Sequence, residues 1–307
     1  MESSRSSKYS LSLLCALLLI GCETTTPRSS KPTVSKETVA VIEEKATSGD
    51  VIAQYQLAML YLTEKIKDQD HKNGMYWLDK AAKNHDPEAQ YQLAGHYHLG
   101  RYIEADKEKA FQWLSLSAEA GYSKSQSRLA KEYYYGEGVP QDYNLSLYWY
   151  ELAAKQGDLD AQTNVGLMYR DGLGVTVDMD KGLSLIKGAA DKGNPFAQGS
   201  MGRMYRQGIG VEVDMEKSAQ WSLLSATGGN GLGQYNLALL YQKGWGITKS
   251  VDKAFYWNQK AAEQGVAGAQ HNLAHIYFVV KQDRAQAAYW LEKALEVELR
   301  PQVHTRY

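Results

Sequence analysis

The chain has 307 residues, of which 34 are Lys or Arg and 35 are Asp or Glu, so its formal net charge at pH 7 is -1. Without long runs of like charge, this balance gives no bulk attraction to nucleic acid or to anionic lipid surfaces, and it argues against both classes of partner. Both cysteines of the chain, Cys15 and Cys22, lie near its N-terminus.

Residues 1–21 have the features of a lipoprotein signal peptide. Basic residues precede an apolar run, 11–20, that is too short to span a bilayer. The run ends in Leu-Ile-Gly-Cys, which resembles the bacterial lipobox and implies cleavage after Gly21 and lipidation of Cys22. Cys15 follows a bulky Leu and would leave with the signal. The mature chain would then have no free thiol, and disulfides would not contribute to its stability.

The segment after the lipidated cysteine indicates where the protein is held. In Gram-negative lipoproteins Asp at the next position commonly marks retention in the inner membrane, so by resemblance Glu23 suggests the outer membrane. Residues 22–36 contain almost no side chain that can bury apolar area, and we expect them to form a flexible tether. Several acyl chains on one cysteine would anchor a body that itself stays in water.

From residue 50 onwards the sequence repeats every 36 residues without an insertion. A strict repeat of this kind indicates a solenoid, a fold that recognises partners far more often than it catalyses reactions. Each unit carries a Gln and, seven positions later, a Tyr. The glutamines are Gln54, Gln90, Gln126, Gln162, Gln198, Gln234 and Gln270, and the tyrosines are Tyr61, Tyr97, Tyr133, Tyr169, Tyr205, Tyr241 and Tyr277.

Each unit is predicted to be a pair of helices, because its apolar residues fall at helical spacing in two blocks. In the middle units the blocks are joined by Gly-x-Gly, as in Gly172-Leu-Gly174, and such glycines can adopt the positive φ angles that end a helix. An Asp follows, placed to cap the second helix with its side-chain oxygen. These capping residues are Asp142, Asp178 and Asp214.

Two more periodic series predict how the helices pack. Small residues would let paired helices approach closely, and they are Ala58, Ala94, Ala130, Gly166, Gly202, Ala238 and Ala274. Tryptophans of the second helix are expected to fill the core between repeats, and they are Trp77, Trp113, Trp149, Trp221, Trp257 and, after a three-residue shortening, Trp290.

The combined pattern resembles the Sel-one-like repeat (SLR) family, relatives of the tetratricopeptide repeats. It reads Ala-x-x-x-Leu-Gly/Ala-x-x-Tyr, then Gly-x-Gly-Val-x-x-Asp-x-x-Lys-Ala, then Trp and Ala-Ala-x-x-Gly, and it covers about residues 37–296. The resemblance implies an all-α fold, an α-solenoid in which seven 36-residue helix-turn-helix repeats form a right-handed superhelix. It also implies a protein-interaction scaffold.

The ends of the solenoid depart from the repeat pattern. Residues 37–49 match part of a second helix in register and predict an N-terminal capping helix, the solenoid occupies 50–299, and 300–307 form a C-terminal tail. The loop glycines are replaced by Glu64 and Ile66 in the first repeat and by Val280 and Gln282 in the last. Terminal units face solvent on one side, so such departures are expected there.

A candidate binding groove follows from the resemblance, because first helices line the concave face of tetratricopeptide-like solenoids. Residues two positions after the Ala of each unit lie roughly 200° from it around the helix. These positions (Tyr55, Tyr91, Ser127, Thr163, Gly199, Tyr235 and His271) and those one and two turns later vary between repeats.

Repeats three to five concentrate basic residues on this face. We predict a partner-binding groove that contacts carboxylates of an acidic peptide, a chain terminus or an acidic glycan. Its residues are Lys131, Tyr134, Arg170, Arg203 and Arg206. An ordinary solvated face is the alternative, because four basic residues among twenty-one positions are only a modest concentration.

No catalytic, cofactor or metal site is predicted. His271 and His275 have the spacing of a metal pair, but no third ligand is evident and Asn272 stands where a zinc protease would carry Glu. We therefore expect a non-enzymatic scaffold or adaptor of the bacterial cell envelope, with a protein partner in its groove and membrane contact through lipid alone.

Other functions remain open at this point. One is an accessory lipoprotein in exopolysaccharide secretion, and another is a host-interaction factor. A more distant alternative is an envelope hydrolase or peptidoglycan-binding protein.

Overall fold

The computed structural model describes residues 34–63 and 70–299, and this part of the chain folds into fifteen α-helices without a strand. The predicted all-α solenoid is therefore confirmed. Cys22, the tether up to residue 33, the loop positions 64 and 66, and the tail 300–307 lie outside the described residues. Among the described helices, none is long and apolar enough to cross a membrane.

The helices follow one another in pairs, one pair for each repeat, after a single helix at the N-terminus. They are α1 (Lys36–Thr47), α2 (Val51–Leu62), α3 (His71–Lys83), α4 (Pro87–Leu99), α5 (Lys107–Glu119), α6 (Ser123–Tyr135), α7 (Tyr143–Lys155), α8 (Leu159–Asp171), α9 (Met179–Asp191), α10 (Pro195–Gln207), α11 (Met215–Thr227), α12 (Gly231–Lys243), α13 (Val251–Glu263), α14 (Ala267–Val279) and α15 (Arg284–Leu299).

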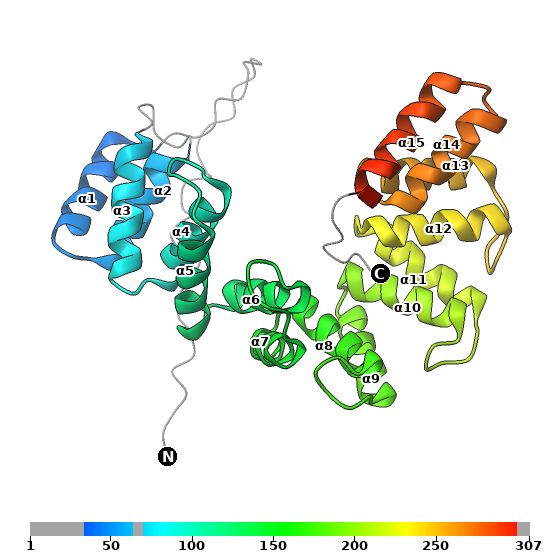
Figure 1. Ribbon diagram of the computed structural model, residues 1–307, viewed down its shortest axis with the longest axis horizontal. Helices are drawn as coiled ribbons and strands as arrows, with labels where there is room; N and C mark the ends of the chain where they lie inside the picture. The colour runs from blue at the N-terminus through cyan, green and yellow to red at the C-terminus, as the bar shows by residue number, and fades with distance from the viewer. Residues whose placement is uncertain (1–33, 64–69, 300–307) are drawn as a thin grey trace, which may run out of the picture.

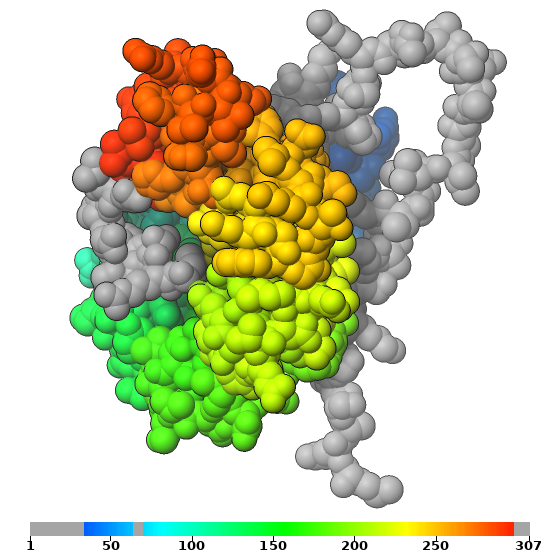
Figure 2. All heavy atoms as spheres, turned by 90° about the vertical axis from the view of Figure 1, so that its right-hand side faces the viewer, coloured from blue at the N-terminus to red at the C-terminus, as the bar shows by residue number. Residues whose placement is uncertain are grey.

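The stack of helices is bent. Each helix packs mainly on its neighbours in sequence, as in a solenoid. The bend places α1–α5 and α12–α15 on opposite sides of α6–α9, with α6 and α8 on the inner side of the bend and α7 and α9 on the outer side (Figure 1). Viewed from the C-terminal side, the helices from α8 to α15 form one continuous column (Figure 2).

The predicted turn chemistry is confirmed at the helix ends. Gly172 and Gly174 both have φ of 69°, the left-handed region in which glycine has no Cβ penalty. The carboxylate of Asp178 accepts a hydrogen bond from the Lys181 N–H at 2.9 Å, and Asp214 does the same for Lys217. In the last repeat, which lacks these glycines, Gln282 takes a positive φ of 55°.

The small residues of the first helices allow the close helix approach that the sequence predicts. A Cβ added to Gly166 would lie 2.7 Å from Ile186 Cγ1 and 2.8 Å from the carbonyl oxygen of Gly182, both on α9. A Cβ added to Gly202 would lie 2.6 Å from the Ser222 hydroxyl on α11. Backbones this close leave no room for a larger side chain.

The repeated Gln connects each repeat to the helix before it. A carbonyl oxygen has two lone pairs, so a carbonyl at the end of a helix that already accepts one backbone N–H can also accept a side-chain donor. Six of the seven glutamines donate to the carbonyl eight residues earlier, at 3.1–3.3 Å. Gln162 is the exception, because its amide donates instead to the carbonyl of Leu185 at 2.8 Å.

The tryptophans of the second helices pack between repeats as predicted, although they are less enclosed than a core residue. Trp113 packs against the buried clusters on both of its sides, and Trp77 is 8% exposed. The other tryptophans of the series are partly buried. The fully enclosed positions belong to smaller residues, such as Leu57, Leu93 and Met201.

Helix α1 packs on α2 in the way that a second helix packs on the next repeat. Its Ala46 is fully buried, and the carbonyl of that residue accepts the hydrogen bond from Gln54. Val39 and Ile42 pack on the same buried cluster, whereas Val41 is 51% exposed. Thus α1 covers the apolar side of the first repeat.

Candidate arginine cluster and adjoining pocket

Three of the predicted groove residues lie close together near the C-terminal ends of α8 and α10. Arg170 and Arg206 stand in the last turns of these helices, and Arg203 lies one turn before Arg206. The partial negative charge of a helix C-terminus favours cations at such positions. Asp171 accepts two hydrogen bonds from Arg170, from Nε and Nη2, both at 2.6 Å. We call these four residues the arginine cluster.

The arginine cluster holds more positive charge than its one carboxylate neutralises. Burial is the main cause that lowers the pKa of Arg203, and the charges of Arg170 and Arg206 lower it further, while Asp171 opposes them. The side chain of Arg170 is only 11% exposed. Its Nη1 and the Nε of Arg206 are buried donors without a hydrogen-bond partner. Such donors are costly unless an acceptor is supplied.

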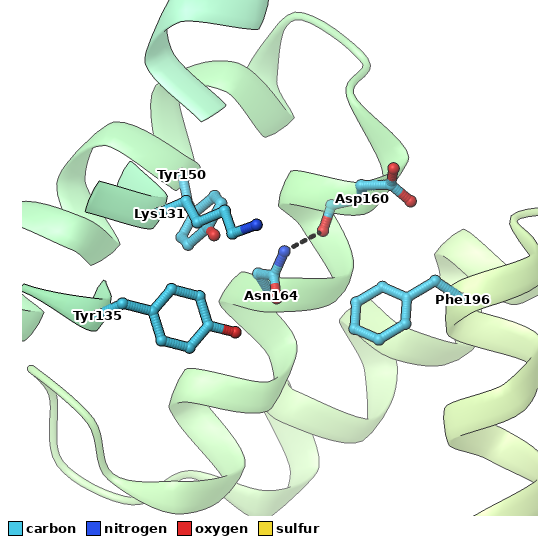
Figure 3. Close-up of a pocket in the computed structure, with 6 residues that line it drawn as sticks. All are labelled: Lys131, Tyr135, Tyr150, Asp160, Asn164 and Phe196. Carbon is cyan, nitrogen blue, oxygen red and sulfur yellow. Dashed lines mark hydrogen bonds between the residues drawn. The ribbon is translucent and has the colours of Figure 1, made fainter. Parts of the chain in front are cut away.

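Lys131 lies in a pocket of about 230 Å³ between α6, α7, α8 and α10. The pocket is lined by Lys131, Tyr135, Tyr150, Asp160, Asn164 and Phe196. In Figure 3 the Lys131 ammonium, the Tyr135 hydroxyl and the Asn164 amide point into the space between the helices, and the Phe196 ring faces them from the opposite side. The donors on one side and the ring on the other suit a ligand that is anionic at one end and apolar at the other.

Asp160 belongs to the rim of this pocket and has its own partners. Its carboxylate accepts a hydrogen bond from Asn194 at 2.7 Å, and its backbone carbonyl accepts one from Asn164 at 3.0 Å. In Figure 3 the Asp160 carboxylate points away from Lys131. The positive charge of Lys131 is therefore the charge that the pocket presents.

Tyr134 is placed differently from the other predicted residues. Its ring packs against the buried cluster that includes Leu147 and Met168, and it meets Tyr143 edge-on at 5.3 Å between ring centroids. Thr163 and Gly199, which belong to the same predicted face, are buried between helices. The face that sequence geometry selects is thus rotated slightly from the one that lines the pocket.

Sequence reasoning missed several residues of this region. Tyr135 and Asn164 each lie one position after a residue assigned to the groove, so a face drawn about 100° wider would have included them. Asp171 follows Arg170 directly, and the ion pair between them could have been proposed from that adjacency. Phe196, at the second position of α10, had no signal in the sequence that set it apart.

The first two repeats have a different character on their first helices. Tyr55 and Tyr122 both interact with the carboxylate of Glu88, and burial followed by the Glu88 charge raises the pKa of Tyr122 to about 12. Tyr91 and Tyr122 lie 5.5 Å apart between ring centroids. The solenoid therefore has an aromatic region around one acid in its first repeats and an excess of positive charge on the first helices of repeats three to five.

No metal centre is evident in residues 34–63 and 70–299, where no three His, Cys, Asp or Glu side chains are placed to hold an ion. The Nδ1 of His96 lies 3.0 Å from the carbonyl oxygen of Arg101. Burial is the main cause that lowers the pKa of His96.

Comparison with family models places a Sel1 repeat on every unit of the solenoid, at residues 51–86, 87–122, 123–158, 159–194, 195–230, 231–266 and 267–296. The chain belongs to the Sel1 repeat family. Sel1 repeat proteins are protein–protein interaction scaffolds, and their fold is generally non-enzymatic. The family expected from the sequence motifs is thereby confirmed.

Solved Sel1 repeat proteins share the fold. The chain is 32% identical to c5321, a protective antigen present in uropathogenic Escherichia coli strains, with a TM-score of 0.64 over 85% of this chain. It spans 56% of the length of that protein. It is 26% identical to a Sel1 repeat protein from Oxalobacter formigenes, with a TM-score of 0.62 over 85% of this chain and 97% of that one.

A more distant structure agrees in fold alone. The immunity protein Pa5087 from Pseudomonas aeruginosa is 19% identical, with a TM-score of 0.50 over 71% of this Sel1 repeat protein and 86% of the other chain. Among curated proteins, none matches this chain.

Proposed function

We propose that this Sel1 repeat protein is a scaffold of the bacterial cell envelope that binds an acidic segment of a partner protein at the arginine cluster. The observation that carries the proposal is the pair of buried, unpartnered donors, Arg170 Nη1 and Arg206 Nε, in a group of three arginines and one carboxylate. Three positive charges and one negative charge leave a net charge of +2.

A carboxylate is the energetically favoured ligand of the arginine cluster. A buried donor without an acceptor lowers the stability of a folded protein by about 1–3 kcal/mol. Two such donors therefore destabilise this protein when no partner is bound. Guanidinium groups match the planar geometry of carboxylates and bind them in bidentate fashion. A partner that supplies carboxylate oxygens would satisfy these donors and offset the repulsion among the arginines.

The neighbouring pocket supports a binding site longer than one residue. Lys131 and Asn164 present a cation and an amide to the same space between the helices. An acidic segment that spans both features would engage the arginine cluster through one side chain and Lys131 through another. Flanking apolar residues would contact the ring of Phe196.

The test is photo-crosslinking in cells with a reactive amino acid at position 203. A matched control carries the same group at Lys187, an exposed residue of α9 whose ammonium pairs with Asp191 at 2.7 Å. We expect a discrete crosslinked product from position 203 and none from position 187. Absence of a product at 203, in cells that express and process the protein, would exclude the cluster as the binding site.

A charge reversal separates binding from folding. Arg203→Glu should abolish the interaction with the captured partner while the far-UV circular dichroism stays unchanged, because Arg203 forms no ion pair among the described residues. Lys187→Glu, a reversal of the same size on the outer side, should leave binding intact. Equal binding by both variants would contradict the proposal.

We further propose that the scaffold is a lipoprotein anchored through Cys22 in the outer membrane. The support is the sequence alone: the apolar run that ends in Leu-Ile-Gly-Cys, and Glu23 after it. Mass spectrometry of the mature N-terminus should find a triacylated Cys22, and Cys22→Ala should release the protein from membranes. Sedimentation of the wild-type protein with inner membranes instead would refute the outer-membrane assignment.

A further inference from the structure

The stripe of tryptophans along the second helices is interrupted in the fourth repeat. Trp149 and Trp221 lie 36 residues before and after position 185, where the chain has Leu185. Each of these indoles packs on the buried cluster of the repeats before it. Leu185 packs on the corresponding cluster, which includes Val165, with a smaller side chain. The fourth repeat therefore has less volume at a position that an indole fills elsewhere.

A pocket of about 340 Å³ lies beside Leu185. Its apolar surface comes from Ala154 of α7, Val165 of α8 and Leu185 of α9. It shares no lining residue with the pocket of Lys131. None of its lining residues belongs to the arginine cluster, so this is a second region of the molecule.

A second departure in the same repeat lies at this pocket. Gln162, which lines it, donates to the Leu185 carbonyl and not to the preceding repeat. Gly188 permits this arrangement, since a Cβ at that position would lie 3.2 Å from Gln162 Nε2. At the position equivalent to Gly188, repeats two, three and five carry Leu116, Leu152 and Leu224, and repeats one and six carry Lys80 and Lys260. Leu185 in place of Trp, Gly188 in place of Leu or Lys, and the redirected hydrogen bond of the Gln162 amide thus lie at one site.

The rim of the pocket carries charge. Lys155, Lys181 and Glu151 line it, which leaves a net charge of +1 from two positive groups and one negative group. Lys181 Nζ lies 3.8 Å from the centroid of the Tyr169 ring, and the Tyr169 hydroxyl donates to Glu151 at 3.2 Å. These contacts hold a cation and an anion at the mouth of an apolar space.

We propose that this pocket binds a tryptophan side chain of a partner protein, with an acidic residue next to that tryptophan. The volume and the apolar walls of the pocket suit an indole, the group that other repeats carry at the position equivalent to Leu185. The electron-rich face of the ring complements the rim lysines, and the adjacent carboxylate complements the net positive rim. The surface is independent of the arginine cluster, so a partner could contact both or only one.

The first test uses N-acetyl-tryptophanamide as the probe, with methyl NMR of the isotope-labelled protein. The probe should shift the methyl resonances of Leu185 and Val165, whereas N-acetyl-leucinamide should not. Leu185→Trp restores the residue of the neighbouring repeats, so it should fold, raise the unfolding midpoint and lose the binding. Absence of shifts at both residues, or equal shifts in Leu185→Trp at Val165, would overturn the proposal.

The second test addresses charge in a variant that leaves the apolar walls intact. The peptide N-acetyl-Trp-Asp-amide should bind roughly two- to fivefold more tightly than N-acetyl-Trp-Lys-amide, the range of a surface charge pair. Lys181→Glu should reverse this preference. An unchanged order of the two peptides would exclude the acidic neighbour. Crosslinking from position 203 is expected to be the same in Leu185→Trp, which distinguishes this surface from the arginine cluster.

Discussion

Gly166→Ala should destabilise the solenoid although alanine is the better helix former. The new Cβ would lie 2.7 Å from Ile186 Cγ1 and 2.8 Å from the Gly182 carbonyl oxygen. The Gly182 carbonyl belongs to the backbone and Ile186 is fully buried, so neither group can move away from the new Cβ. Overpacking of this kind costs about 1–3 kcal/mol, and two hard contacts place the cost in the upper half of the range. Replacing glycine by alanine inside a helix stabilises the helix by about 1 kcal/mol. We expect a net loss of about 1–2 kcal/mol.

Gly95→Ala is the matched control, because Gly95 is also helical and a Cβ there would meet no atom within 4 Å. It should gain about 0.5–1 kcal/mol. Urea unfolding followed by circular dichroism at 222 nm would measure both free energies of unfolding. If Gly166→Ala proved as stable as Gly95→Ala, the close approach of α8 and α9 would not exist as described.

Three further predictions concern stability. Gln126→Ala removes the hydrogen bonds to the Ala118 carbonyl and from Gln156, and it should cost about 1–3 kcal/mol in urea unfolding, whereas Gln259→Ala, at an exposed pair, should cost almost nothing. Asp178→Ala removes the cap of α9 and should cost about 1 kcal/mol, and a thermal melt no lower than that of wild type would contradict this role. The pKa of His96 is lowered in the folded protein, so as the pH falls the unfolded chain binds a proton at this residue before the folded chain does. The free energy of unfolding should therefore fall as the pH drops below 6.5. Measured at pH 7.5 and 5.5, this decrease should be smaller in His96→Gln than in the wild type.

The local chemistry of the fold could be predicted from sequence, and the contacts between repeats could not. Gly172 and Asp178 act within a few residues of their own position, so their spacing alone identified the turn and the cap. The role of Gln126 depends on which carbonyl of another helix lies above it. Its periodicity was visible, but the acceptor could only be found in three dimensions.

How much of the candidate site could be predicted from the sequence was limited in the same way, by contacts between helices. Arg170, Arg203 and Arg206 could be placed on one face because helix geometry fixes their angular positions. Their burial, and the unpartnered Nη1 of Arg170, depend on how α8 and α10 pack. The pocket includes Asn164 and excludes the buried Thr163, which lies one residue earlier. A single angle estimated from an isolated helix is not sharp enough to separate such neighbours.

The diverted amide of Gln162 also bears on how the molecule would respond to force. In six repeats a glutamine ties the first helix to the helix before it, but ahead of α8 this tie is missing. A solenoid loaded from its ends carries tension through every junction in series, so rupture begins at the weakest one. A protein held at one end and pulled by a partner at the other would therefore lack this one cross-link at the junction of α7 and α8, between the third and the fourth repeat.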